Sequence, residues 1–120
     1  MVIRQQQMET FSNASQVSFE DRMEAHLGRC SPEECRKLGA EGVRGVIRHG
    51  IHRARVHGII LERDVCKYID VMFAFGPDFD SDPKLPWASA ILSDDSINDA
   101  TNRTEHLFET AKLHSRRHLI

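Results

Sequence analysis

Residues 59–87 constrain the fold most, because they combine an apolar helix, an abrupt stop and a loop that ends on the only tryptophan. The apolar residues recur with the three- and four-residue spacing of an α-helix rather than with the alternation of a strand. They are Leu61, Val65, Tyr68, Ile69, Met72, Phe73 and Phe75. Gly76 and Pro77 end the pattern, since glycine accepts a left-handed turn and proline cannot continue a helix. The C-terminal half is apolar nearly all round, which predicts a central helix buried between neighbours.

Two residues of this helix carry reactive groups. Asp70 stands in an apolar context, and an unpaired buried charge is costly. We therefore expect Asp70 to pair with an arginine or a loop amide, with a catalytic acid as the alternative. Cys66 lacks a glycine-rich elbow or a histidine near it in sequence, so we interpret it as a small buried hydrophobe rather than a nucleophile.

The remaining segments also show helical spacing only, and no segment alternates with period two. A Ser-Pro-Glu-Glu capping box at 31–34 predicts a helix start. The expected helices are 3–28, a short 32–39, 40–57, the central helix, a short one from Pro86, and a last one from about Ile97 to His118. The sequence thus predicts an all-α fold: a compact bundle of four principal helices and two short ones, forming one domain over 1–120.

The segment 40–57 has two contrasting faces. One is a narrow stripe of small and β-branched residues that includes Gly50. Glycine in a helix interior costs up to about 1 kcal/mol relative to alanine, so we expect another helix to approach closely there. The other face carries Arg44, Arg48, His52 and Arg55, and residues 44–58 contain four arginines, three histidines and no acid.

The acidic counterpart lies later in the chain, where residues 70–99 hold seven aspartates against one base, Lys84. We hypothesise that the basic and acidic regions have complementary charge and interact electrostatically, either with each other within the fold or with a partner. A solvated basic face is the alternative.

Asp78, Asp80 and Asp82 are spaced like the start of a calcium loop, but Pro83 and Ser89 stand where an EF-hand needs glycine and glutamate. We expect these aspartates to cap turns while Phe79 and Trp87 hold the loop on the core.

His26, Cys30 and Cys35 raise the alternative of a zinc site. Structural zinc needs a second pair of ligands, and the sequence offers only His49 and His52 on a basic helix. Phosphate-loop, dinucleotide and nucleophile-elbow motifs are missing from the sequence. We therefore expect no catalytic residue, no cofactor and no metal, and a protein that is not an enzyme.

Net charge and hydropathy further limit the class of protein that this chain can be. The net charge is −2, with 16 basic and 18 acidic residues, which argues against a dedicated nucleic-acid binder. No run approaches 18 apolar residues, so we expect no membrane span. The N-terminal residues lack the apolar core of a secretory signal, which favours a cytoplasmic protein with three free thiols.

The stretch 62–88 (ERDVCKYIDVMFAFGPDFDSDPKLPWA), together with residues 2–8 (VIRQQQM), resembles a family of small bacterial proteins from type VI secretion loci. In these loci, the genes lie beside spike (VgrG), PAAR-tip and effector genes. The resemblance covers most of the chain, and 62–88 is its specific part. It implies an effector accessory, either an adaptor or co-chaperone or an immunity protein, and it carries no catalytic residues with it.

We therefore expect a non-enzymatic protein-binding accessory whose partner is an effector, toxin, chaperone or spike component. The aromatics beside acids in the 75–87 loop are typical of interfaces. The expected partner-binding residues are Arg44, Arg48, Arg55, Asp78, Phe79, Asp80, Asp82 and Trp87. The alternatives are an immunity protein that neutralises a cognate toxin and, in another class, a regulatory nucleic-acid-binding helical protein. Apolar stripes on the first and last helices are also compatible with a homodimer.

Overall fold

The structure, a computed structural model, describes residues 13–97 and 99–115. Every regular element within these ranges is helical. The elements are α2 (Asn13–Cys30), α3 (Pro32–Val56), α4 (Glu62–Phe75), the short 3-10 helix η1 (Phe79–Ser81), α5 (Pro86–Leu92) and α6 (Ala100–His114). The prediction of an all-α fold is confirmed. Within the same ranges, no helix is both long enough and apolar enough to cross a bilayer.

The helix count differs from the expected four principal and two short helices, because the described part of the chain has five α-helices. The difference arises at Gly39, which was expected to close a short helix. Gly39 has φ 76° and ψ 168°, which are not helical, so two helical segments meet at a kink there within α3. A positive φ is strained for any residue with a Cβ, so glycine permits this bend. The two predicted helices are therefore one element bent at the residue expected to separate them.

Two helix boundaries also differ from those predicted. The helix α2 continues through Gly28 to Cys30. The last helix begins at Ala100 rather than at Ile97, because the Asp99 side chain accepts a hydrogen bond from the Thr101 N–H at 3.0 Å and caps it. The parts of the predicted first and last helices at 3–12 and 116–118 lie outside the described residues.

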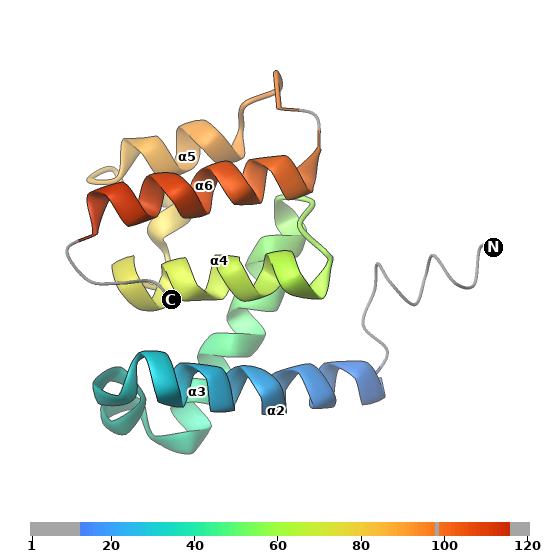
Figure 1. The fold of residues 1–120 in the computed structure, drawn as a ribbon, viewed down its shortest axis with the longest axis vertical. Helices are drawn as coiled ribbons and strands as arrows, with labels where there is room; N and C mark the ends of the chain where they lie inside the picture. The colour runs from blue at the N-terminus through green and yellow to red at the C-terminus, as the bar shows by residue number, and fades with distance from the viewer. Residues whose placement is uncertain (1–12, 98, 116–120) are drawn as a thin grey trace.

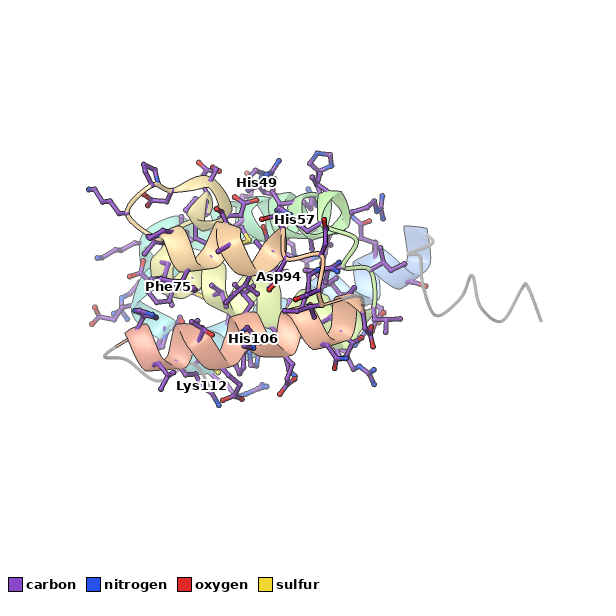
Figure 2. The ribbon with its side chains drawn as sticks, turned by 90° about the horizontal axis from the view of Figure 1, so that it is seen from above. His49, His57, Phe75, Asp94, His106 and Lys112 are labelled. Carbon is purple, nitrogen blue, oxygen red and sulfur yellow. The ribbon has the colours of Figure 1, made fainter. Side chains whose placement is uncertain are left out.

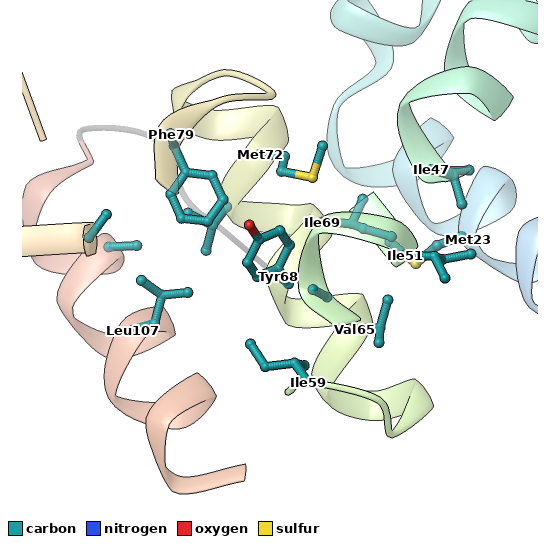
Figure 3. Close-up of a cluster of buried hydrophobic side chains, with 14 of the residues drawn as sticks. Met23, Ile47, Ile51, Ile59, Val65, Tyr68, Ile69, Met72, Phe79 and Leu107 are labelled. Atoms are coloured by element: carbon teal, nitrogen blue, oxygen red, sulfur yellow. The ribbon is translucent and has the colours of Figure 1, made fainter. Parts of the chain in front are cut away.

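The helix α4 occupies the middle of the fold, as predicted. Figure 1 shows α5 and α6 side by side, α4 next to them, α2 on the far side of α4, and α3 crossing behind α4. The contacts agree, because α4 touches α2, α3, α6 and η1. Its side chains form the centre of the buried cluster in Figure 3, where Tyr68, Ile69 and Met72 meet residues of α3 and η1.

The expected close approach of helices occurs at Gly50. A Cβ added there would lie 2.6 Å from Cγ1 of Ile69 and 2.9 Å from Sδ of Met72, so the missing side chain lets α3 rest directly on α4. Gly45 has nothing within 4 Å of such a Cβ. One glycine of the segment thus serves helix packing, while Gly45 does not.

Candidate functional site

Asp80 in η1 is the centre of a buried polar cluster. Its side chain is almost fully buried, and one oxygen, Oδ2, receives all of its hydrogen bonds. Arg53 donates from Nη2 at 2.7 Å and from Nε at 3.0 Å. His57 Nε2 lies 2.8 Å from the same oxygen, and the Tyr68 hydroxyl donates at 3.0 Å. The cluster therefore joins the end of α3, the middle of α4 and η1.

The electrostatics of this cluster favour an ionised Asp80. Burial by itself raises the pKa of Asp80, but the hydrogen bonds from His57, Arg53 and Tyr68 outweigh it and leave the pKa below its usual value. Burial and the negative charge of Asp80 raise the pKa of Tyr68, which keeps its hydroxyl protonated as a donor. The groups thus form a charge-assisted network that holds the loop in place.

A second contact ties the same loop to α3 nearer the surface. His49 Nε2 lies 3.5 Å from Asp78, whose side chain is well exposed. Figure 2 shows His49 and His57 on the same side of the molecule, along α3 and its C-terminal end. The hypothesis that the basic segment and the acidic loop interact through their charges is confirmed for this part of the fold. The residues that carry the contact are His49, Arg53 and His57. From the sequence, His49 was named only as a possible metal ligand, and Arg53 and His57 were not named.

Arg44 and Arg48 form ion pairs with acids outside residues 70–99, so the hypothesis is wrong for these two residues. Both pair with Glu20 of α2, at 3.1 Å each. Arg44 also pairs with Asp21 and, at 2.9 Å, with Glu24. Burial raises the pKa of Glu20, but hydrogen bonds from Arg48, Gln16 and Arg44 lower it overall. These arginines therefore fasten α3 to α2 instead of facing residues 70–99.

The other predicted partner-binding residues divide between core and surface. Phe79 is 1% exposed and its ring lies 5.0 Å from that of Tyr68. Trp87 is half-buried, stacks on His114 at 4.9 Å and meets Phe75 edge-on at 5.2 Å. These two aromatics hold the loop on the core, as expected. Because Phe79 and Asp80 are buried, they can serve a partner only by positioning the loop.

Asp82 and Arg55 reach the surface to different degrees. The Asp82 carboxylate accepts the Lys84 N–H at 2.9 Å and so caps a turn, as expected for these aspartates. Arg55 is exposed and makes no ion pair with any acid in 13–97 or 99–115. The charge of Arg55 is therefore available to another molecule.

A third group of side chains gathers between α2 and α4. His26 Nε2 lies 2.9 Å from Oδ1 and 3.2 Å from Oδ2 of Asp70. One donor atom each of His26, Cys66 and Asp70 lies within 4.8 Å of the others. Asp70 is therefore paired, but with a histidine rather than the expected arginine or loop amide. Burial raises the pKa of Asp70, and His26 offsets part of that shift.

This group does not have the geometry of a cysteine nucleophile with its base. Burial and the nearby negative charge of Asp70 raise the pKa of the Cys66 thiol to about 11, so it is protonated at neutral pH. The Cys30 sulfur lies 3.8 Å from Nδ1 and 3.9 Å from Nε2 of His26. Both distances exceed the roughly 2.6–3.2 Å at which a general base takes a proton from its nucleophile.

The sequence contained a signal for this group that the zinc argument missed. His26 and Cys30 are four residues apart on one helix, and Cys66 and Asp70 are four residues apart on another. Residues at this spacing lie on one helix face. The ligands considered for zinc lay only on α2 and α3, whereas the structure places His26 beside Cys66 and Asp70 of α4. Neither Cys30 nor Cys35 belongs to this group of three, although the Cys30 sulfur lies 3.8 Å from His26 Nδ1.

A scan against protein-family models matches no family, and searches of the curated proteins and of the solved structures return no match.

Proposed function

We propose that this chain is a non-enzymatic protein-binding accessory of a type VI secretion effector locus, with an adaptor or co-chaperone-like role. The resemblance of residues 2–8 and 62–88 to a family from such loci supports the assignment to the locus. The exposed outer face of α3 supports the binding role. It is the observation on which the proposal rests, because His52 and Arg55 project there without a described acidic partner.

The outer face of α3 is one continuous surface. At about 100° per residue, positions 48, 52 and 55 fall within about 60° of one another around the helix axis. Val56 lies beside them and is 57% exposed. Arg48 contributes although it pairs with Glu20, since its side chain is 62% exposed. Arginine next to an exposed apolar side chain is the composition that interface centres favour.

The charge of this face selects the chemistry of the partner. A basic stripe attracts an acidic segment, and Asp78, which pairs with His49 of α3, repels a polyanion that extends beyond the stripe. The whole chain carries a net charge of −2, which further disfavours nucleic acid. The partner class is therefore a protein with a short acidic surface, such as an effector or a spike component.

The test is a tagged pull-down from cells that carry the locus, read by mass spectrometry, with His52→Glu/Arg55→Glu beside the wild type. Neither residue pairs with an acid in the part of the chain that the structure describes, so the double variant should fold and should recover the partner at least about 10-fold less well. The matched control is Arg36→Glu, another exposed arginine of α3, whose ion pair is with Glu33 one turn away. This control should recover the partner as the wild type does.

Three other outcomes oppose the proposal. If the double variant recovered as much partner as the wild type, the outer face of α3 would not be the binding surface. Salt-sensitive recovery of nucleic acid instead of protein would favour the regulatory alternative. A partner identified as a toxin, with cells protected by this chain, would replace the adaptor role by immunity.

A further inference from the structure

We propose that His26, Cys30, Cys66 and Asp70 form a tetrahedral Zn²⁺ site that joins α2 to α4. This inference is independent of the proposed protein-binding surface on α3. It rests on three donor side chains whose ligand atoms lie within 4.8 Å of one another, those of His26, Cys66 and Asp70. Cys30 is added because its sulfur lies 3.9 Å from His26 Nε2.

The distances between the donors suit a metal of this size. Zinc bonds of about 2.0–2.3 Å place tetrahedral ligand atoms roughly 3.3–3.8 Å apart. His26 Nε2 lies 2.9 Å from Asp70 Oδ1, and the donor atoms of His26, Cys66 and Asp70 are all within 4.8 Å of one another. The Cys30 sulfur is 3.9 Å from His26 Nε2. Cys30 lies outside the group of three whose donor atoms are within 4.8 Å of one another, so its side chain must rotate toward Cys66 and Asp70 to complete the four ligands.

The donor set selects the kind of metal. Two sulfurs and one imidazole are soft or intermediate ligands, which bind Zn²⁺ and discriminate against Mg²⁺ and Ca²⁺. With both thiols deprotonated and Asp70 ionised, the ligands carry three negative charges against two on the metal. The thiol protons pass to solvent when zinc binds, so binding should release protons.

The site is sheltered and still reachable. The side chain of Asp70 is 11% exposed and that of His26 is 25% exposed. His26 and Cys66 also line a pocket of about 430 Å³, whose other lining residues come from α2 and the first turn of α4 and its flank. Arg22 at this pocket is paired with Glu62 at 3.1 Å, so its charge is partly offset. A metal ion can therefore enter from the pocket.

A bound zinc would act as a clamp between helices. The helix α2 packs mainly on α3 and touches α4 much less. Metal bonds from both helices would fix α2 on α4 and favour the folded state over the unfolded chain, because the unfolded chain has no preformed site.

The test uses the purified full chain, stripped with a chelator and kept reduced with a non-thiol phosphine. Zn²⁺ is then titrated by calorimetry, and Co²⁺ serves as a coloured substitute. We expect one metal per chain, a zinc Kd below about 1 µM, and a Tm that rises with zinc. The sulfur-to-cobalt absorption band should have the intensity of two thiolates.

The variants assign the ligands. Cys30→Ser and Cys66→Ser should each halve the sulfur-to-cobalt band and raise the zinc Kd at least about 100-fold. Cys35→Ser is the matched control and should bind as the wild type does. Should a serine variant fail to fold, Asp70→Asn takes its place and should weaken zinc binding without changing the number of thiolates. The proposal is overturned if the wild type binds no stoichiometric zinc, or if Cys35→Ser removes binding while Cys66→Ser keeps it.

Discussion

Arg53 and Asp80 are joined by two hydrogen bonds, of 3.0 Å from Nε and 2.7 Å from Nη2, although 27 residues separate them. The same carboxylate oxygen also accepts from Tyr68 and lies 2.8 Å from His57 Nε2. One buried acid thus holds η1 against both α3 and α4. The loop that follows α4 has its position fixed from inside the core.

Replacing Asp80 by alanine should therefore destabilise the fold strongly. The change leaves Arg53, His57 and the Tyr68 hydroxyl without their acceptor, and breaking a buried charged pair typically costs about 3–5 kcal/mol. Urea unfolding followed by circular dichroism measures the loss. The control is Asp78→Ala, because this exposed acid makes one ion pair, to His49, and should cost less than about 0.5 kcal/mol. Similar losses for the two variants would contradict the assignment of Asp80 as the anchor.

Acid should weaken the fold through the same carboxylate. The folded-state pKa of Asp80 lies below its unfolded value, because the three donors outweigh the effect of burial. The unfolded chain then binds the proton more tightly, so stability falls as pH falls. This contribution is present above the unfolded-state pKa of about 3.9 and is lost as the pH drops through the folded-state pKa. Urea midpoints measured from pH 6 down to about pH 2.5 should show a shallower decline for Asp80→Asn than for the wild type. Parallel curves would contradict it.

Glu20 gives a prediction about the contact between α2 and α3. This residue is 2% exposed and binds Arg44 and Arg48, so Glu20→Ala should cost about 1–3 kcal/mol. The cost stays below that of Asp80→Ala because Arg44 keeps Asp21 and Glu24 as partners and the Arg48 side chain is 62% exposed. Asp21→Ala is the matched control: Asp21 also pairs with Arg44 but is exposed, and its loss should be within about 0.5 kcal/mol in urea unfolding. If Asp21→Ala proved the more damaging, burial would not be what gives Glu20 its importance.

The helices, which depend on local spacing, could be predicted from the sequence. The ion pairs between helices could not, because they depend on which helices pack against each other. The period of Val65, Ile69 and Met72 and the stop at Gly76 give α4 and its central place, since apolar spacing is a property of the segment itself. The acids that pair with Arg44 come from α2, and the base that pairs with Asp70 is His26. Such pairings need the helix crossing order, which no local pattern contains. Only the i, i+4 spacing of His26 with Cys30 and of Cys66 with Asp70 was available in advance.

The glycines of α3 provide the sharpest test of helix packing, because two of them should respond in opposite directions. At both positions alanine gains up to about 1 kcal/mol of helix propensity over glycine. At Gly45 a Cβ meets nothing within 4 Å, so Gly45→Ala should stabilise the fold by up to that amount. At Gly50 the Cβ would lie 2.6 Å from Ile69 and 2.9 Å from Met72, and overpacking of this kind costs about 1–3 kcal/mol.

Gly50→Ala should consequently lower the Tm while Gly45→Ala raises it, as calorimetry of the two variants can measure. The sign at Gly50 depends on how far the Ile69 side chain can move, since its Cγ1 atom is the nearest neighbour and is attached directly to Cβ. Ile69 is fully buried among other core side chains and has little space to retreat. Adding Ile69→Val to Gly50→Ala removes one methyl group beside the new Cβ and should recover part of the lost stability. If the second substitution lowered the Tm further by its full separate cost, the contact between Gly50 and Ile69 would not be the source of the strain.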